Sequence, residues 1–176
     1  MKPRFFPKLC VLLLLVPFLC SCEFGWKQYI NEDNDFSILL PASWEKQEDV
    51  FDAALIVLAP VKGKNKNPPV RANMNIIVAD LPARADLDIV FDFNRTELSS
   101  KLARIDDIIA GDIYAGPLLG RQVSFAGLLS GFQVKIISAN WVKGRRVYTV
   151  TCTSALNEFP KYEKTFKKMF RTLRIK

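Results

Sequence analysis

Histidine does not occur in this chain of 176 residues. No imidazole is therefore available to activate a serine or cysteine nucleophile, to act as a general base or to ligate a metal ion. The serines stand outside any G-x-S-x-G motif, and the glycines form neither a phosphate-binding nor a dinucleotide-binding pattern. The sequence therefore predicts a protein that is not an enzyme and that has no metal or other cofactor.

Long apolar runs are also missing. The longest, LCVLLLLVPFLC at residues 9–20, follows a basic start, and as a helix it would span about 18 Å. A bilayer core is about 30 Å thick, so this run is too short to cross it. A basic start followed by a short apolar run is typical of a signal peptide, and we expect residues 1–21 to be one.

The end of this signal resembles a bacterial lipobox. Leu19 stands at position −3, Ser21 at −1 and Cys22 at +1, although Cys20 at −2 departs from the usual Ala, Ser, Thr or Val. The resemblance implies cleavage before Cys22, which is then joined to diacylglycerol and N-acylated, with palmitate as the typical acyl chain. Ordinary secretion with cleavage nearby is the alternative. By resemblance to enterobacterial sorting, Glu23 at +2 favours the outer membrane.

Few cysteines remain after such cleavage. The two cysteines inside the signal are removed and Cys22 is lipidated, so Cys152 has no partner for an internal disulfide. Cys152 alternates in phase with Tyr148 and Val150, which places it on the core side of a strand. We expect a buried, reduced side chain and not a reactive thiol.

The rest of the chain predicts one α+β domain at residues 36–176, after a lipidated cysteine and tether at residues 22–35. Apolar spacing predicts helices at 86–104, with Asp86 as N-cap, and at 158–170. Short connections between the later strands indicate antiparallel hairpins, and hence a twisted antiparallel sheet with helices on its faces. Strands are predicted at 36–40, 53–59, 70–81, 108–114, 118–125, 132–142 and 145–153, with short strands at 44–48 and 173–175 and a basic loop at 61–69.

Three features of this pattern are shared with a known group of proteins. The first strand runs into a P-x-x-W turn in FSILLPASW (36–44), a helix follows the third strand, and the chain closes with YTVTC (148–152) and the spaced aromatic residues of 159–173. On these features the exported part resembles the PsbP-like superfamily, which includes an extrinsic photosystem II subunit and DcrB-type bacterial lipoproteins. It also resembles small chlamydia-type envelope lipoproteins.

The resemblance implies an α/β/α sandwich around an antiparallel sheet. It also implies a lipid-anchored or peripheral module that binds or scaffolds without catalysis. Metal ions in some photosynthetic relatives involve histidines, so that property does not carry over to this chain.

Acidic residues gather around the first predicted helix. Carboxylate clusters of this kind can bind calcium. However, no D-x-D-x-D-G loop is present, and acids near a helix start are expected because they stabilise the helix dipole. We therefore interpret these residues as structural: Asp86, Asp88, Asp92, Asp106 and Asp107.

Basic residues gather in loops and on the closing helix. Nucleic acid is not an expected partner of an exported protein, and we interpret the loops as solvated, with contact to anionic lipid or to an acidic partner as the alternative. On the closing helix, basic residues recur at steps of three, four and three. This spacing predicts an electrostatic surface that does not insert into lipid. The loop residues are Lys62, Lys64, Lys66, Arg71 and the KGRR turn at 143–146, and the helix residues are Lys161, Lys164, Lys168 and Arg171.

These observations lead to one functional prediction with one alternative. We expect an envelope lipoprotein that is attached to the membrane by its acyl chains, faces the periplasm and binds or scaffolds a protein partner. The alternative is a periplasmic carrier or sensor of a small ligand, with a pocket between sheet and helix. An exposed apolar patch would favour the first, and a dry interior pocket the second.

Overall fold

The computed structural model describes residues 25–61 and 68–176. Within these ranges no helix combines the length and the apolar character needed to cross a membrane. Some of the predicted sites lie outside the described residues, namely Leu19, Ser21, Cys22, Lys62, Lys64 and Lys66.

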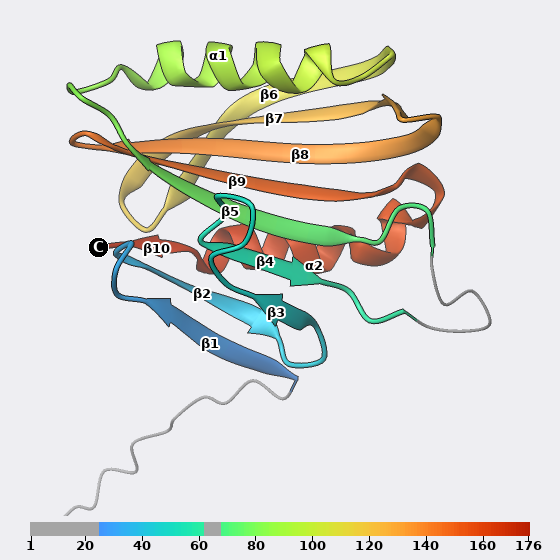
Figure 1. Cartoon of the computed structure of the whole chain (residues 1–176), viewed down its shortest axis with the longest axis horizontal. Coiled ribbons are helices and arrows are strands. Elements are labelled where there is room, and N and C mark those ends of the chain that lie inside the picture. The colour runs from blue at the N-terminus through green and yellow to red at the C-terminus, as the bar shows by residue number, and fades with distance from the viewer. Residues whose placement is uncertain (1–24, 62–67) are drawn as a thin grey trace, which may run out of the picture.

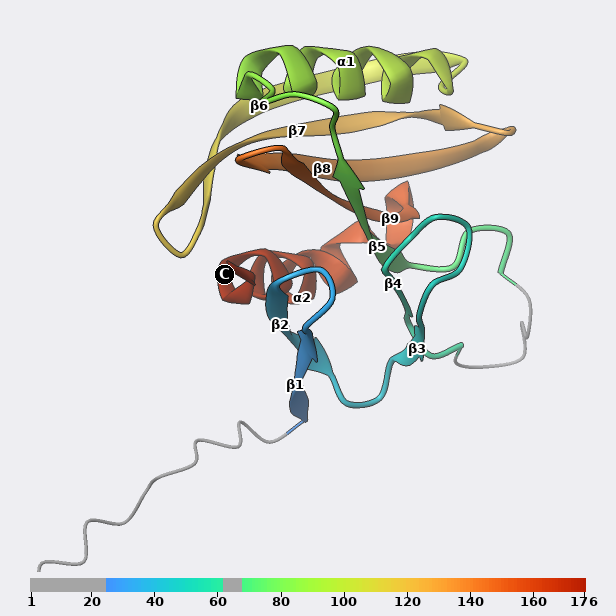
Figure 2. The ribbon, with the colours of Figure 1, turned by 60° about the vertical axis from the view of Figure 1, so that its left-hand side comes forward.

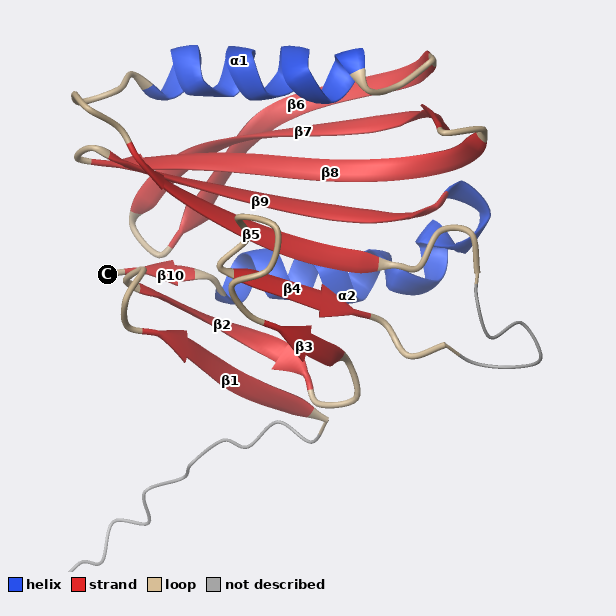
Figure 3. Ribbon diagram, viewed as in Figure 1, coloured by secondary structure: helices blue, strands red, loops and turns tan. Residues whose placement is uncertain are grey.

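A seven-stranded antiparallel sheet forms the centre of the molecule (Figure 1, Figure 3). Its strand order is β3-β4-β5-β9-β8-β7-β6, and the hairpins predicted between β6, β7, β8 and β9 are confirmed. The strands are β3 (Glu45–Gln47), β4 (Leu55–Leu58), β5 (Asn73–Asp80), β6 (Arg104–Ala115), β7 (Leu118–Leu129), β8 (Phe132–Lys143) and β9 (Arg146–Ala155).

A second sheet has three strands, in the order β1-β2-β10. They are β1 (Trp26–Asn31), β2 (Phe36–Pro41) and β10 (Arg174–Ile175), the last of which confirms the short closing strand. The prediction of a tether through residue 35 is wrong for β1, because this segment pairs with β2 along its whole length. Half of its side chains are exposed, which fits its polar sequence, and backbone hydrogen bonds hold it in place.

One helix lies on each face of the large sheet, so the predicted α+β sandwich is confirmed (Figure 2). Helix α1 (Leu87–Ser100) packs on β7 and β8. Helix α2 (Phe159–Thr172) follows the 3-10 turn η1 (Leu156–Glu158) and lies between the large sheet and β2. Asp86 caps α1 as expected, since its Oδ1 accepts hydrogen bonds from the backbone N–H of Asp88 and Ile89, at 2.8 and 3.2 Å.

Helix α1 is shorter than predicted. It ends at Ser100, where the backbone N–H of Leu102 bonds to the carbonyl of Ser99, and Ala103 already pairs with Leu128. Leu102 is buried as expected of the apolar face, but it lies in the turn after the helix. The apolar spacing continues into β6, so periodicity alone did not mark this end.

The larger of two core clusters fills the space between the large sheet, α2 and the small sheet. Trp44, from the P-x-x-W turn, meets Tyr162 and Phe166 of α2 edge to face, with ring centroids 5.8 and 6.0 Å apart. Cys152 is fully buried in this cluster, which confirms its predicted placement, and burial raises the pKa of its thiol. The smaller cluster lies under α1 and includes Phe125.

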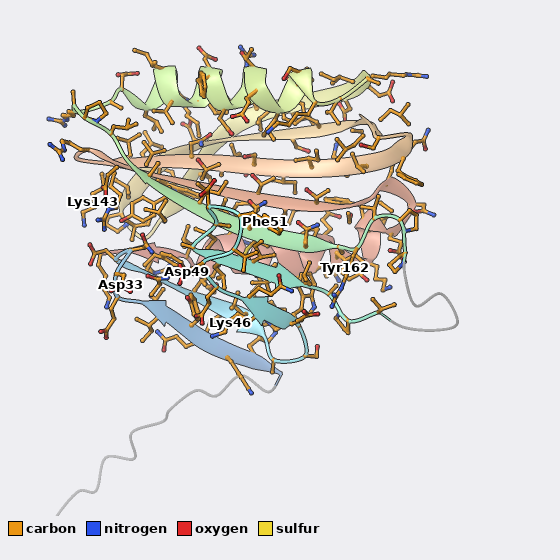
Figure 4. The ribbon with its side chains drawn as sticks, in the orientation of Figure 1. Asp33, Lys46, Asp49, Phe51, Lys143 and Tyr162 are labelled. Atoms are coloured by element: carbon orange, nitrogen blue, oxygen red, sulfur yellow. The ribbon has the colours of Figure 1, made fainter. Side chains whose placement is uncertain are left out.

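The small sheet also contacts β3 and the residues after it. The ammonium of Lys46 lies 4.7 Å from the centre of the Tyr29 ring and 3.1 Å from the Glu48 carboxylate. Burial, and then a hydrogen bond with Glu48, raise the pKa of Tyr29 to about 12. Figure 4 labels Lys46 together with Phe51, which is 90% exposed in the next loop.

Candidate functional site

A groove of about 870 Å³ lies between α2 and strands β6, β7 and β8. Its volume is in the range of small-molecule sites, and its place between a helix and a sheet is typical of them. The side chains that line it are mostly apolar along the floor and basic along the rim. The floor contains Ile109, Ile113, Gln122, Ser124, Ile137, Phe159 and Phe170, and the rim contains Lys135, Glu163, Lys167, Arg171 and Arg174.

The pairing of the strands explains the apolar floor. Ile109 pairs with Ser124, and Ser124 pairs with Ile137, so these three residues form a row across the sheet. Ile109 and Ile113 are separated by an even number of residues and point to the same face of β6. The floor is therefore built from side chains that the sheet brings together from three strands.

Gly111 lies between the two isoleucines on the same face of β6. A Cβ atom built on Gly111 meets no other atom within 4 Å. Its register partner is Gln122, which itself lines the groove. The lack of a side chain at this position helps to keep the middle of the groove open.

Two of the basic rim residues are neutralised by carboxylates. Lys167 Nζ lies 2.6 Å from Glu163 Oε1, and Lys135 Nζ lies 3.3 Å from Asp107 Oδ2. Both pairs are partly exposed, so their contribution to stability is small. They leave the middle of the rim nearly balanced in charge.

The end of the groove near the β6–β7 turn differs, because Arg171 and Arg174 meet there. Across residues 25–61 and 68–176, no carboxylate forms an ion pair with either guanidinium. One nitrogen of Arg174, Nη1, donates to the backbone carbonyls of Arg171 and Leu173, at 2.8 and 2.7 Å. A guanidinium has five N–H donors, so this end of the groove retains donors and positive charge for an anion.

The basic face predicted for the closing helix is present, but its members have different surroundings. Lys161 Nζ lies 3.6 Å from Glu158, and its hydrogen bond with Tyr162 is the main reason that its pKa is raised. Lys168 Nζ lies over the ring of Trp26, 4.3 Å from its centre. The aromatic side of the helix is core, as expected, because Phe166 is fully buried. Binding of this face to an anionic membrane stays a prediction.

Four of the five acids around α1 are held in ion pairs, and the fifth, Asp86, is the N-cap. Asp88 Oδ1 accepts a hydrogen bond from Arg121 Nε at 2.8 Å, and Arg121 also pairs with Asp112. Asp106 pairs with Arg104 at 2.6 Å. In the part of the chain that the structure describes, no three acidic or cysteine side chains are grouped so that they could hold a metal ion.

Two of the basic loop residues that the structure describes, Arg71 and Arg146, are held in ion pairs. Arg71 lies 2.8 Å from the Glu45 carboxylate and donates to the Ala59 carbonyl at 2.6 Å. Arg146, from the KGRR turn, pairs with Asp80 and Asp35 at 3.0 and 3.1 Å. Its hydrogen bond lowers the pKa of Asp80.

The sequence suggested a pocket between sheet and helix as part of the alternative function, but it did not identify the residues of the groove. It placed Arg171 on a membrane-facing surface and gave no role to Ile109, Gly111, Lys135 or Arg174. The alternation of two isoleucines around Gly111 could have indicated an apolar strand face with a gap in it. The position of α2 beside that face depends on the tertiary structure.

No protein-family profile and no curated protein matches the chain, but solved structures do. Cyanobacterial PsbP (CyanoP) of Synechocystis matches with a TM-score of 0.64 at 11% identity, over 90% of this chain and 99% of that one. LpqN of Mycobacterium tuberculosis, described as involved in cell envelope biogenesis, matches with a TM-score of 0.68 at 12% identity, over 85% and 91%. The Ran-binding protein Mog1p of Saccharomyces cerevisiae matches with 0.57 at 9% identity, over 85% and 95%.

The fold is therefore that of the PsbP-like proteins, as the sequence resemblance implied. The same architecture occurs in a cyanobacterial PsbP, in a protein involved in cell envelope biogenesis and in a Ran-binding protein. A shared fold does not fix a shared function, so the function of this chain has to be argued from its own groove.

Proposed function

We propose that this chain is a lipid-anchored envelope protein that acts as a non-enzymatic binding module, with the groove beside α2 as its binding site. The observation that carries the proposal is the combination of an apolar floor with two guanidiniums at one end, Arg171 and Arg174, that have no carboxylate partner among the described residues. Such a surface offers affinity through apolar contact and orientation through charge. The export signal and the lipobox at Cys22 support a place in the envelope, as does the description of LpqN.

The chemistry of the groove supports binding over catalysis. Ser124 and Tyr114 carry the hydroxyls that line it, and a chain without histidine offers them no imidazole base. Lys135 is paired with Asp107, and Glu163 with Lys167, so these groups are engaged in ion pairs at the rim.

A second candidate function is the carriage or sensing of a small ligand, which the volume and position of the groove favour. The groove is an open channel, so it corresponds neither to a dry interior pocket nor to a flat apolar patch. The two candidates share one binding site and differ in what occupies it.

Lysine footprinting tests whether the groove is occupied in the envelope. Lys167 lies at the groove and Lys101 follows α1 on the other face of the sheet. The two are well matched, because each pairs with a glutamate four residues earlier, and their side chains are 56% and 57% exposed. We expect acetylation of Lys167 to be slower in native envelope membranes than in the purified chain, while Lys101 reacts equally in both. Equal rates for Lys167 in the two preparations would remove the groove as the binding site.

Attachment to the membrane is tested separately with Cys22→Ala. Thioether linkage requires the thiol, so we expect this variant to lose both fatty-acid label and sedimentation with membranes. Cys152→Ala is the matched control, because Cys152 is buried and lies outside the signal sequence. An alanine variant at position 22 that still carried label or still sedimented would show that the anchor lies elsewhere.

A further inference from the structure

We propose that the groove binds a single-chain anionic lipid, with its acyl chain along the floor of β6 and its head group at Arg171 and Arg174. The inference rests on the proposed function, because it takes the same groove as the binding site. It goes further by naming the chemical class of the occupant and the direction in which that occupant lies.

The floor supplies the contact surface for an acyl chain. Ile109 is 60% exposed although it belongs to a regular strand, and Ile113, Ile137, Phe159 and Phe170 continue the apolar surface. Exposure of these apolar side chains to water is unfavourable, so their burial under an acyl chain is favourable. Gly111 adds room at the centre, where a side chain would otherwise cross the channel.

The length of the floor matches an extended chain. From Ile109 to Tyr114, both of which line the groove, strand β6 advances five residues, which is about 16 Å at roughly 3.3 Å per residue. Helix α2 borders this stretch, with Phe159 from its first turn and Arg171 from its last turn both lining the groove. A groove that follows β6 and α2 over this length, with a mostly apolar floor, suits an acyl chain better than a compact ring system.

The charges give the occupant a direction. Lys135 and Lys167 are balanced by Asp107 and Glu163, whereas Arg171 and Arg174 have no carboxylate partner among the described residues. Arg174 lies at the β6–β7 turn, since its Cδ is 3.4 Å from the Cβ position of Gly116. Carboxylate and phosphate groups form strong, often bidentate hydrogen bonds with guanidinium groups. The anionic head group is therefore placed at this end.

An acidic peptide would fit this groove less well than a lipid with one acyl chain. Its backbone N–H and C=O groups would need hydrogen-bond partners when it covers the floor, and an unpaired buried peptide group is costly. Of the floor residues, Gln122 and Ser124 have polar side chains, and the others are apolar. An acyl chain has no polar groups to satisfy along its length.

The test uses the full-length chain in nanodiscs of zwitterionic phosphatidylcholine, with palmitate that carries a photoreactive diazirine and an alkyne tag. The alcohol of the same length and with the same groups is the uncharged comparison probe. Crosslinked peptides are then mapped by mass spectrometry. We expect palmitate to label peptides of β6 and α2, and to label them more strongly than the alcohol does.

Two variants and two matched controls locate the chain and the head group. Gly111→Phe fills the channel and should lower labelling by palmitate about tenfold, whereas Ala110→Phe, on the opposite face of β6, should leave it unchanged. The pair Arg171→Gln and Arg174→Gln should remove the preference for palmitate over the alcohol. The pair Arg84→Gln and Arg145→Gln removes the same charge from exposed sites outside the groove and should keep that preference.

Three outcomes would overturn the lipid assignment. The first is equal labelling of Gly111→Phe and Ala110→Phe, and the second is equal labelling of the wild type by acid and alcohol. The third is displacement of palmitate, measured as loss of label, by an acidic peptide that has no acyl chain. If Gly111→Phe abolishes the protection of Lys167 in native membranes while palmitate leaves the groove unlabelled, the proposed function stands and the lipid inference fails. If Lys167 shows no protection either, both fail.

Discussion

The two faces of the large sheet each carry one helix, but the two helices are held in different ways. Helix α2 buries Phe166, Met169 and Phe170 in the main core, whereas no residue of α1 is fully buried. The contacts of α1 include a polar one, since Asn94 Nδ2 donates to Asn140 Oδ1 and Ser138 Oγ, at 2.9 and 3.1 Å.

This difference explains where a binding site can form. Large buried side chains fix the position of helix α2 in the core. The helix can therefore border β6 without closing the groove between them. Helix α1 rests on its sheet face through a smaller cluster and side-chain hydrogen bonds, and acts as a cover. A helix that is firmly anchored along one edge can serve as the wall of a groove.

The largest expected effect comes from weakening the anchor of α2. Phe166→Ala removes a fully buried ring that touches Trp44, Phe159 and Tyr162. We expect a loss of about 3–5 kcal/mol in the free energy of unfolding. Leu98→Ala, at the partly buried face of α1, should cost about 1 kcal/mol. Urea denaturation of the two variants measures both values, and similar losses would show that the two helices are anchored alike.

A smaller effect is expected from the polar contact of α1. Asn94→Ala leaves the fully buried Asn140 without one of its partners, which should cost about 1–3 kcal/mol. Thr96→Ala, at an exposed position of the same helix, should have almost no effect. A double-mutant cycle between Asn94 and Asn140 measures the coupling directly. Additive losses at the two sites would mean that the hydrogen bond does not hold α1.

The smallest effect concerns pH and the small sheet on which α2 rests. The pKa of Tyr29 is raised from 10.0 to about 12, first by burial and then by its hydrogen bond with Glu48. Because the folded state keeps this proton while the unfolded chain loses it, the stability that it contributes is present below pH 10 and is lost between pH 10 and about pH 12. Unfolding curves should therefore show a shallower decline for Tyr29→Phe than for the wild type across that range. Parallel declines would exclude Tyr29 as the cause.

Much of the fold could be predicted from local patterns. The alternation of Met74, Ile76 and Val78 marked β5, and the cap at Asp86 marked the start of α1. Strand β1 was not predicted, because Lys27 and Gln28 are both exposed and leave little alternation of apolar and polar residues to detect. The end of α1 was misplaced because Leu102 and Ile105 continue the helical spacing after the helix has ended.

The groove could be predicted less well than the fold. Its residues come from five elements, β6, β7, β8, α2 and β10, and extend from Ile109 to Arg174. The basic residues of the closing helix were recognised, but Arg171 was grouped with Lys161, Lys164 and Lys168 on one helical face. Periodicity describes one element at a time, and therefore does not reveal which neighbour each face meets.

The amino-acid sequence was enough to establish the α+β class, the hairpin order of the later strands and the buried position of Cys152, because each depends on the spacing of apolar side chains along one segment. Packing of α2 beside β6, by contrast, placed an apolar floor next to Arg171 and Arg174, and within residues 25–61 and 68–176 it left those two cations without a carboxylate partner. Charge balance and cavity shape depend on distances between segments of the chain, and these distances are set when the chain folds.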